Sequence, residues 1–103
     1  MNLTKENFYD TINDNKVVLV DFWASWCGPC LMLTPVVETL EVEYKGKAIV
    51  GKVDTQAETY LSTEYGIRSL PTLVLFKDGK PVEQFVGVRP KSFYSDKLDY
   101  YLN

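Results

Sequence analysis

The sequence predicts an α/β domain built around a mixed β-sheet. An apolar run from Val17 to Ala24, interrupted only by Asp21, is typical of a strand that is buried on both faces of such a sheet. A helical pattern and a second strand over residues 48–54 follow it and complete a β-α-β unit, which is right-handed by strong precedent. Further along, Asp78-Gly79 lies between two short apolar strands and predicts an antiparallel hairpin.

The first half of the chain begins with a short helix that Thr4 can cap. Leu3 and Phe8 are spaced as a hydrophobic staple around this cap. After the first strand, a helix is expected from about residue 27 to 44, with Pro35 inside it. Its apolar positions recur on one face, namely Leu33, Val37, Leu40 and Tyr44.

The second half predicts three further elements and a final helix. A helix is expected from about residue 56 to 65, followed by strands over residues 72–76 and 82–86. Pro90 opens the last helix. Its apolar stripe consists of Tyr94, Leu98, Tyr101 and Leu102. Because no repeat, linker or low-complexity segment interrupts the pattern, we expect a single domain over residues 1–103.

Composition and charge exclude several classes of function. The net charge is -3 and the basic residues form no block, which argues against a nucleic-acid partner. No apolar run approaches the roughly 18 residues of a membrane span. The N-terminal residues Met1 to Lys5 lack the apolar segment of a signal peptide, so a cytoplasmic location is the default expectation.

Cys27 and Cys30 are the only cysteines in the chain and are separated by two residues. Such a pair suits a metal, a structural disulfide or a reversible disulfide. A zinc site usually has four ligands, and without any His it would need carboxylates here. A structural disulfide usually closes a longer loop, because the entropic benefit grows with the residues enclosed. Beside a β-α-β unit, the pair is best interpreted as a redox motif.

Asp21 is the second unusual residue, a carboxylate inside an otherwise apolar strand. A position facing the surface fits poorly beside Val20 and Phe22. An isolated buried carboxylate is destabilising and has a raised pKa, which suits proton transfer.

These features resemble the thioredoxin family. The resemblance rests on segments that span most of the chain in the family's order: VDFWASWCGPC (20–30), Pro35, Lys52-Val53-Asp54, YGIRSLPTL (65–73), FKDGK (76–80) and FVG (85–87). It implies the thioredoxin fold, with a central five-stranded mixed sheet of order 1-3-2-4-5 and four helices in three layers. It also implies a general protein-disulfide reductase that acts on disulfide-containing client proteins and is recycled by a flavoprotein thioredoxin reductase. We expect the protein to be a monomer. We expect it to need no metal and no cofactor beyond the Cys27–Cys30 disulfide.

The resemblance assigns catalytic roles to four residues. Cys27 would stand at a helix N-terminus, which favours a thiolate, and would attack the client disulfide. Cys30, one turn inward, would resolve the mixed disulfide. Asp21 would lie behind Cys30 and help to deprotonate it, with Lys52 on the neighbouring strand modulating it. The alternative for Asp21 and Lys52 is a structural ion pair.

The resemblance also implies a client-binding surface around Cys27. Pro71 matches the family's cis-proline, and it would expose the Leu70 backbone so that a client segment pairs with it as an added strand. Gly28 and Pro29 allow a tight turn over the sulfurs. The apolar collar around Cys27 is expected to consist of Trp26, Leu70, Val86, Gly87 and Val88.

One residue departs from the family pattern. Leu31 stands where the family often has Lys or Arg, which leaves the reaction class intact but makes the binding face more apolar. Oxidase and isomerase domains of this fold typically have His between the cysteines, and this chain has none. A binding module, in which the domain is a stable subunit of a larger assembly, needs the same exposed collar and stays open as an alternative.

Overall fold

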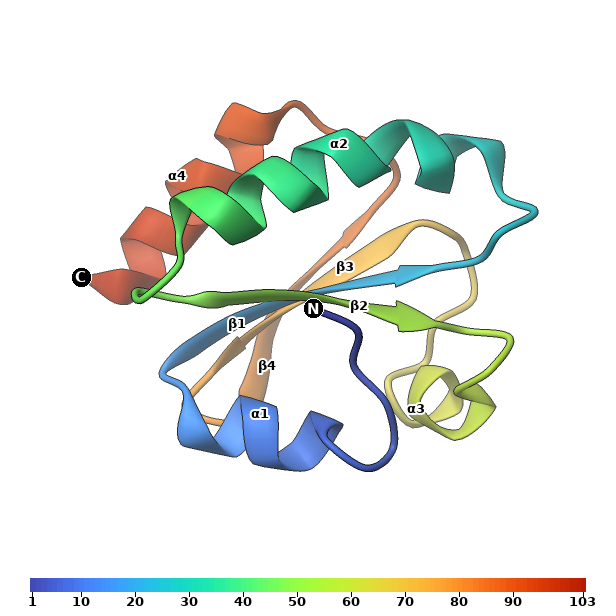
Figure 1. Ribbon diagram of the computed structural model, residues 1–103, viewed down its shortest axis with the longest axis horizontal. Coiled ribbons are helices and arrows are strands. Elements are labelled where there is room, and N and C mark those ends of the chain that lie inside the picture. The colour runs from blue at the N-terminus through green and yellow to red at the C-terminus, as the bar shows by residue number, and fades with distance from the viewer.

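The structure, a computed structural model that describes residues 1–103, contains four helices and four strands (Figure 1). In chain order these are α1 (Phe8–Asp14), β1 (Val17–Trp23), α2 (Gly28–Glu43), β2 (Ile49–Asp54), α3 (Thr59–Glu64), β3 (Thr72–Lys77), β4 (Lys80–Val86) and α4 (Lys91–Leu102). All four helices and all four strands that the residue pattern predicts are therefore present. None of the helices combines the length and the apolar character needed to cross a membrane.

The sheet is the middle of three layers. Helices α2 and α4 cover one face, and α1 and α3 lie on the other (Figure 1). Two separate buried clusters fill the two interfaces, and β1 contributes alternate residues to each. Val17 and Leu19 belong to the cluster with α2 and α4, whereas Val18, Val20 and Phe22 pack with α1 and α3. The absence of apolar–polar alternation in β1 is thus explained by burial on both faces.

The strands are arranged in the order β2-β1-β3-β4. Strands β1 and β2 are parallel, while β3 is antiparallel to both β1 and β4, so the sheet is mixed as predicted. The register places Asp21 of β1 opposite Lys52 of β2 and Leu73 of β3. Paired positions point to the same face, so this register fixes which side chains surround Asp21.

The expectation of a fifth strand is wrong. At the outer edge of β2, where that strand would lie, the chain makes only an isolated bridge between Asn2 and Lys52. Two backbone hydrogen bonds of 2.8 Å accompany it, from Leu3 N to Lys52 O and from Lys52 N to Met1 O. The chain then turns at Thr4, whose carbonyl accepts a hydrogen bond from Phe8 N. This turn ends the pairing before a ladder can form.

The predicted N-cap of the first helix is also wrong. The helix begins at Phe8, and the Thr4 hydroxyl makes no capping bond. Instead Asn7 Oδ1 accepts a hydrogen bond from Thr4 N at 2.7 Å, which closes a turn before the helix. Helix α3 is likewise shorter than predicted, because Asp54 Oδ1 accepts from Gln56 N and holds residues 54–58 in a turn.

The hairpin between β3 and β4 forms at Asp78 and Gly79, as the sequence predicts. Their φ angles are 53° and 83°, and two positive φ values are what a type I′ turn requires. Strand β4 is the edge strand, and its register shifts next to Pro81. A proline is tolerated there because an edge strand has a neighbour on one side only, so the N–H that proline lacks is not needed to pair with a further strand.

Candidate redox site

Cys27 and Cys30 form a disulfide at the N-terminus of α2. Their Cα atoms are 5.2 Å apart, within the normal range for a disulfide. Cys27 is the N-cap residue of α2, and its Sγ accepts a hydrogen bond from Cys30 N at 3.2 Å. The unpaired N–H groups at a helix N-terminus favour negative charge. The site is therefore suited to a thiolate at Cys27 once the disulfide is reduced.

The two sulfur-bearing residues lie at different depths. Cys27 is 5% exposed and Cys30 is 1% exposed. Cys30 shares a helix face with Leu33 and Val37, three and seven residues further on, and that face packs against the sheet. Cys27 thus lies at the tip of α2, and Cys30 lies one turn inside. The side chains that pack around the pair are Ala24, Trp23 and Leu70.

Asp21 is a carboxylate buried in the middle of β1, with 1% of its surface exposed. It faces the α2 side of the sheet, because its neighbours Val20 and Phe22 pack on the other side. Its Oδ1 atom has no hydrogen-bond partner. Burial raises the pKa of Asp21 from 3.8 to about 7, and the charge of Lys52 opposes this shift. A carboxyl group with such a pKa can exchange a proton near neutral pH.

Lys52 lies opposite Asp21 in the register of β1 and β2, and no salt bridge joins the two. The Lys52 ammonium instead lies 5.4 Å from the centre of the Trp23 ring, within the range of a cation–π interaction. The electrostatic effect of Lys52 on Asp21 therefore acts through space. Of the two arrangements weighed from the sequence, the direct ion pair is not formed.

The loop before β3 and the segment after β4 meet beside the cysteine pair. The Leu70-Pro71 peptide bond is cis, as the sequence resemblance implies. Gly87 N donates a hydrogen bond to Pro71 O at 2.9 Å, and Val86 pairs with Thr72 at the end of the ladder. Because Leu70 also packs against the cysteines, these segments form one surface with the tip of α2.

Most of the predicted collar is exposed around this tip. Trp26 is 68% exposed, and Val86 and Val88 are also exposed, whereas Leu70 is half-buried. Gly28 and Pro29 are exposed at the start of α2, and Gly87 is half-buried. Pro71 is buried, so it can contribute to a binding surface only through its neighbours.

Met32 is an exposed apolar residue that sequence reasoning missed. It lies beside the exposed Leu31 on the first turns of α2, and both point away from the sheet. The signal was available, because Leu31, Met32 and Leu33 are consecutive. Three consecutive residues span about 200° of a helix at 3.6 residues per turn, so they cannot all face the core, and here only Leu33 does.

Tyr94 is a second residue whose contacts near the redox site sequence reasoning missed. The sequence placed it on the apolar stripe of the last helix, and it is completely buried there. Its hydroxyl accepts a hydrogen bond from Arg89 N at 3.2 Å and donates one to Gly87 O at 3.5 Å. A buried phenol usually finds a polar partner, and this rule could have indicated such contacts.

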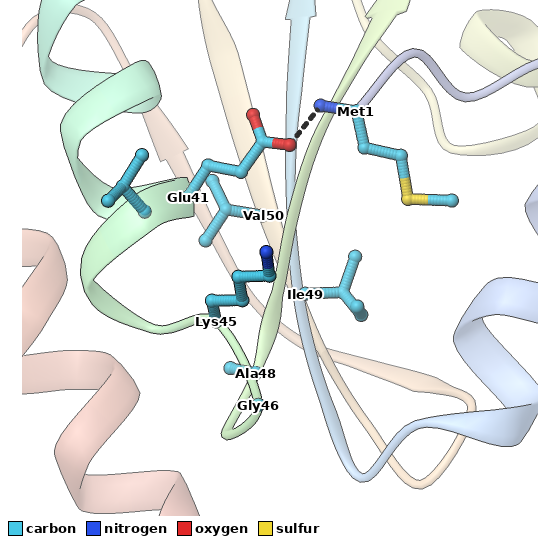
Figure 2. Close-up of a pocket in the computed structure, with 8 residues that line it drawn as sticks. Met1, Glu41, Lys45, Gly46, Ala48, Ile49 and Val50 are labelled. Carbon is cyan, nitrogen blue, oxygen red and sulfur yellow. Dashed lines mark hydrogen bonds and ion pairs between the residues drawn. The ribbon is translucent and has the colours of Figure 1, made fainter.

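A separate surface pocket of about 370 Å³ lies between the C-terminal part of α2 and β2. Figure 2 shows its ion pair of 2.7 Å between the Met1 amino group and Glu41. Glu41 is roughly 16 Å along the helix from Cys30, at about 1.5 Å per residue, so the pocket is no part of the redox site. No group of three or more His, Cys, Asp or Glu residues in the structure could hold a metal ion.

Comparisons with known proteins point to one family. The family model described as Thioredoxin matches residues 1–99. The chain is 48% identical to "Thioredoxin 2" of Chlorobaculum tepidum, over 96% of this chain and 92% of the relative. It is 45% identical to a thioredoxin of Staphylococcus aureus, over 91% of this chain and 90% of the relative. Among solved structures, a mutant thioredoxin from Halobacterium salinarum matches with a TM-score of 0.93 and 42% identity, covering 100% of this chain and 90% of that one.

Proposed function

The chain belongs to the thioredoxin family and is a thiol-disulfide oxidoreductase, and we propose that Cys27 is its attacking thiol and Cys30 its resolving thiol. Its reaction is the reduction of disulfides by dithiol–disulfide exchange through this pair. The observation that carries the assignment of roles is the placement of Cys27 as the N-cap of α2, with Cys30 one turn deeper.

The proposed exchange consists of two displacements. The Cys27 thiolate attacks one sulfur of the client disulfide, so that a Cys27–client disulfide forms and the other client sulfur leaves as a thiolate. Cys30 then loses its proton and attacks the Cys27 sulfur, which forms the Cys27–Cys30 disulfide and releases the second client thiolate. Both client thiolates take up protons. Two electrons and two protons have thus moved from the protein dithiol to the client.

Asp21 is proposed to accept the proton that Cys30 loses. Both residues lie between the sheet and α2, where few other groups could take a proton. The pKa of about 7 supports the role, because a base near the working pH can take the proton and later release it. Lys52 is proposed to limit the rise of this pKa through its charge, which favours the ionised form that acts as the base.

The client is proposed to bind as an added strand beside Leu70. No hydrogen bond within the protein uses the backbone N–H or C=O of Leu70, so both are free to pair with a client segment. The apolar side chains that would contact this segment lie at the tip of α2 and after β4. They are Trp26, Val86 and Val88, with Gly28, Pro29, Pro71 and Gly87 shaping the backbone between them.

The proposed partners follow from this chemistry. The clients are disulfide-containing proteins, and a flavoprotein thioredoxin reductase returns the Cys27–Cys30 disulfide to the dithiol. The protein is proposed to act as a monomeric electron carrier in the cytoplasm, where a lone cysteine pair is more often catalytic than structural. No cofactor beyond the disulfide takes part in the proposed cycle.

Insulin reduction by dithiothreitol tests this function against a pure binding role. Catalytic amounts of the protein should accelerate the precipitation of insulin chains, and Cys27→Ser and Cys30→Ser should both abolish the acceleration. A matched control is Ser25→Ala, which lies near the pair but has no part in the exchange. A wild-type protein without acceleration would indicate a binding module instead.

A further inference from the structure

Tyr94 carries the only buried phenol hydroxyl that reaches the backbone beside the redox site. The residue lies in the first turns of α4 and is 0% exposed. Its ring packs against Phe85 and Phe93, with ring centres 6.2 Å and 5.5 Å away. Its hydroxyl bonds to backbone groups of Arg89 and Gly87, which precede the helix. Ring and hydroxyl therefore have different surroundings, one in the core and one at the loop.

The Tyr94 hydroxyl binds the loop of residues 87–89, which contributes Gly87 and Val88 to the apolar collar around Cys27. Gly87 has a φ of +92°, so the chain departs here from the extended backbone of β4. On its other side, Gly87 N donates to Pro71 O. Gly87 is thus fixed through its N–H to the Leu70-Pro71 loop and through its carbonyl to Tyr94. Residues 87–89 make no backbone–backbone hydrogen bond other than the one from Gly87 N to Pro71 O.

Tyr94 also lies on the same face of the sheet as the redox chemistry. Asp21 pairs with Leu73 across β1 and β3, and Leu73 pairs with Phe85 across β3 and β4. Paired residues point to one face, and the Tyr94 ring packs on Phe85 at the end of this row. The residue therefore connects the core under α4 to the surface where a client would bind.

We propose that Tyr94 is a positioning residue for client binding, whose hydroxyl holds residues 87–89 in the conformation that a client segment contacts. The inference rests on the proposed function, in which Val86, Gly87 and Val88 are part of the client-binding surface. A small disulfide does not need that surface. The hydroxyl should thus matter for protein disulfides and not for small ones.

The test separates the hydroxyl from the ring with Tyr94→Phe. A matched control is Tyr44→Phe, because the buried Tyr44 hydroxyl bonds to Asp99 Oδ1 at 2.6 Å and Ser95 O at 3.1 Å, at the other end of α2. Tyr94→Phe removes both hydrogen bonds of the hydroxyl, the 3.2 Å bond from Arg89 N and the longer 3.5 Å bond to Gly87 O. We expect the KM for insulin to rise by roughly threefold to tenfold, the scale on which such bonds contribute. The kcat and the rate with 5,5′-dithiobis(2-nitrobenzoic acid) should stay unchanged.

A second measurement detects the hydrogen bond between Arg89 N and the Tyr94 hydroxyl independently of enzyme activity. The Arg89 amide should exchange its hydrogen faster in Tyr94→Phe than in wild type or Tyr44→Phe. An unchanged KM for insulin in Tyr94→Phe, an equal rise in Tyr44→Phe, or a parallel loss with the small disulfide would overturn the inference. A wild-type protein that reduced neither substrate would instead contradict the proposed function.

Discussion

Asp21 and Lys52 lie opposite each other on the parallel strands β1 and β2, yet they form no salt bridge. The Lys52 ammonium lies over the Trp23 ring, and Asp21 Oδ1 has no hydrogen-bond partner. Asp21 is therefore a buried carboxyl group that a nearby charge influences without neutralising it. This arrangement accounts for a pKa of about 7, where burial outweighs the opposing effect of Lys52.

The first prediction concerns stability against pH. The pKa of Asp21 is about 7 in the folded protein and 3.8 as the ordinary value, so between these pH values the unfolded chain has lost a proton that the folded protein keeps. The contribution of Asp21 to the free energy of unfolding should therefore fall as pH rises from about 4 to 7. Asp21→Asn lacks this titration. Relative to wild type it should gain a few kcal/mol over the interval, at about 1.4 kcal/mol per pKa unit.

Denaturant unfolding of the oxidised proteins at pH 4, 5.5, 7 and 8 measures this difference without titrating thiols. The two stabilities should diverge as pH rises and then run parallel above about pH 7. Parallel profiles over the whole range would show that the carboxyl of Asp21 titrates normally.

The second prediction concerns turnover of the same variant. Asp21→Asn keeps the shape of the side chain but cannot accept a proton from Cys30. Insulin reduction should slow by about 10²-fold or more if the proton transfer limits the rate, which is the usual scale of general base catalysis. The formation of the first mixed disulfide should be unaffected in single-turnover mixing. A wild-type rate for the resolution of the mixed disulfide by Cys30, measured in the same single-turnover mixing, would remove Asp21 from the mechanism.

The third prediction concerns client preference. Leu31 is exposed on the first turns of α2, so Leu31→Lys places a cation beside the client-binding surface. The ratio of rates for an acidic over an apolar disulfide peptide should rise about twofold to fivefold, and the change should shrink at 0.5 M salt, where the screening length is about 4 Å. Val42→Lys is a matched control, because Val42 is also exposed and lies near the far end of α2. An equal shift in both variants would point to net charge alone.

The fourth prediction concerns the collar. Trp26 is 68% exposed, so Trp26→Ala should change the free energy of unfolding by no more than about 0.5 kcal/mol, as is usual for surface residues. Its kcat/KM for insulin should nevertheless fall several-fold, since the exposed ring is proposed to contact the client. Tyr100→Ala, similarly exposed on α4, controls for the loss of an aromatic ring. Retained kcat/KM in Trp26→Ala would exclude Trp26 from the surface.

The sequence predicted most of the fold because its patterns are local. The burial of β1, the β-α-β unit and the hairpin at Asp78 and Gly79 all follow from residues close in the chain. The fifth strand, which the family resemblance alone implied, was wrong because pairing at the edge of β2 depends on where the chain turns, and it turns at Thr4. Nothing local determines such a long-range contact.

In the redox site too, features that are visible in the local sequence were predicted, and contacts between distant residues were not. The cysteine pair and Asp21 stand out against their sequence neighbours, and the structure buries Asp21 as predicted. The stacking of Lys52 on Trp23 and the bonds of the Tyr94 hydroxyl to residues 87–89 depend on side-chain directions after folding. A pattern of apolar positions predicts that Tyr94 is buried, but it carries no information about the partner of the hydroxyl.

The most direct test of the central claim is to identify which sulfur holds the client. Reduced Cys30→Ser mixed with insulin should accumulate a disulfide between Cys27 and an insulin chain, which mass spectrometry of the acid-quenched mixture locates. Reduced Cys27→Ser should accumulate none at the same time point, because Cys30 is one turn inside α2 and 1% exposed. A client disulfide on Cys30 in Cys27→Ser, formed as fast as the one on Cys27 in Cys30→Ser, would contradict the assignment of attacking and resolving thiols.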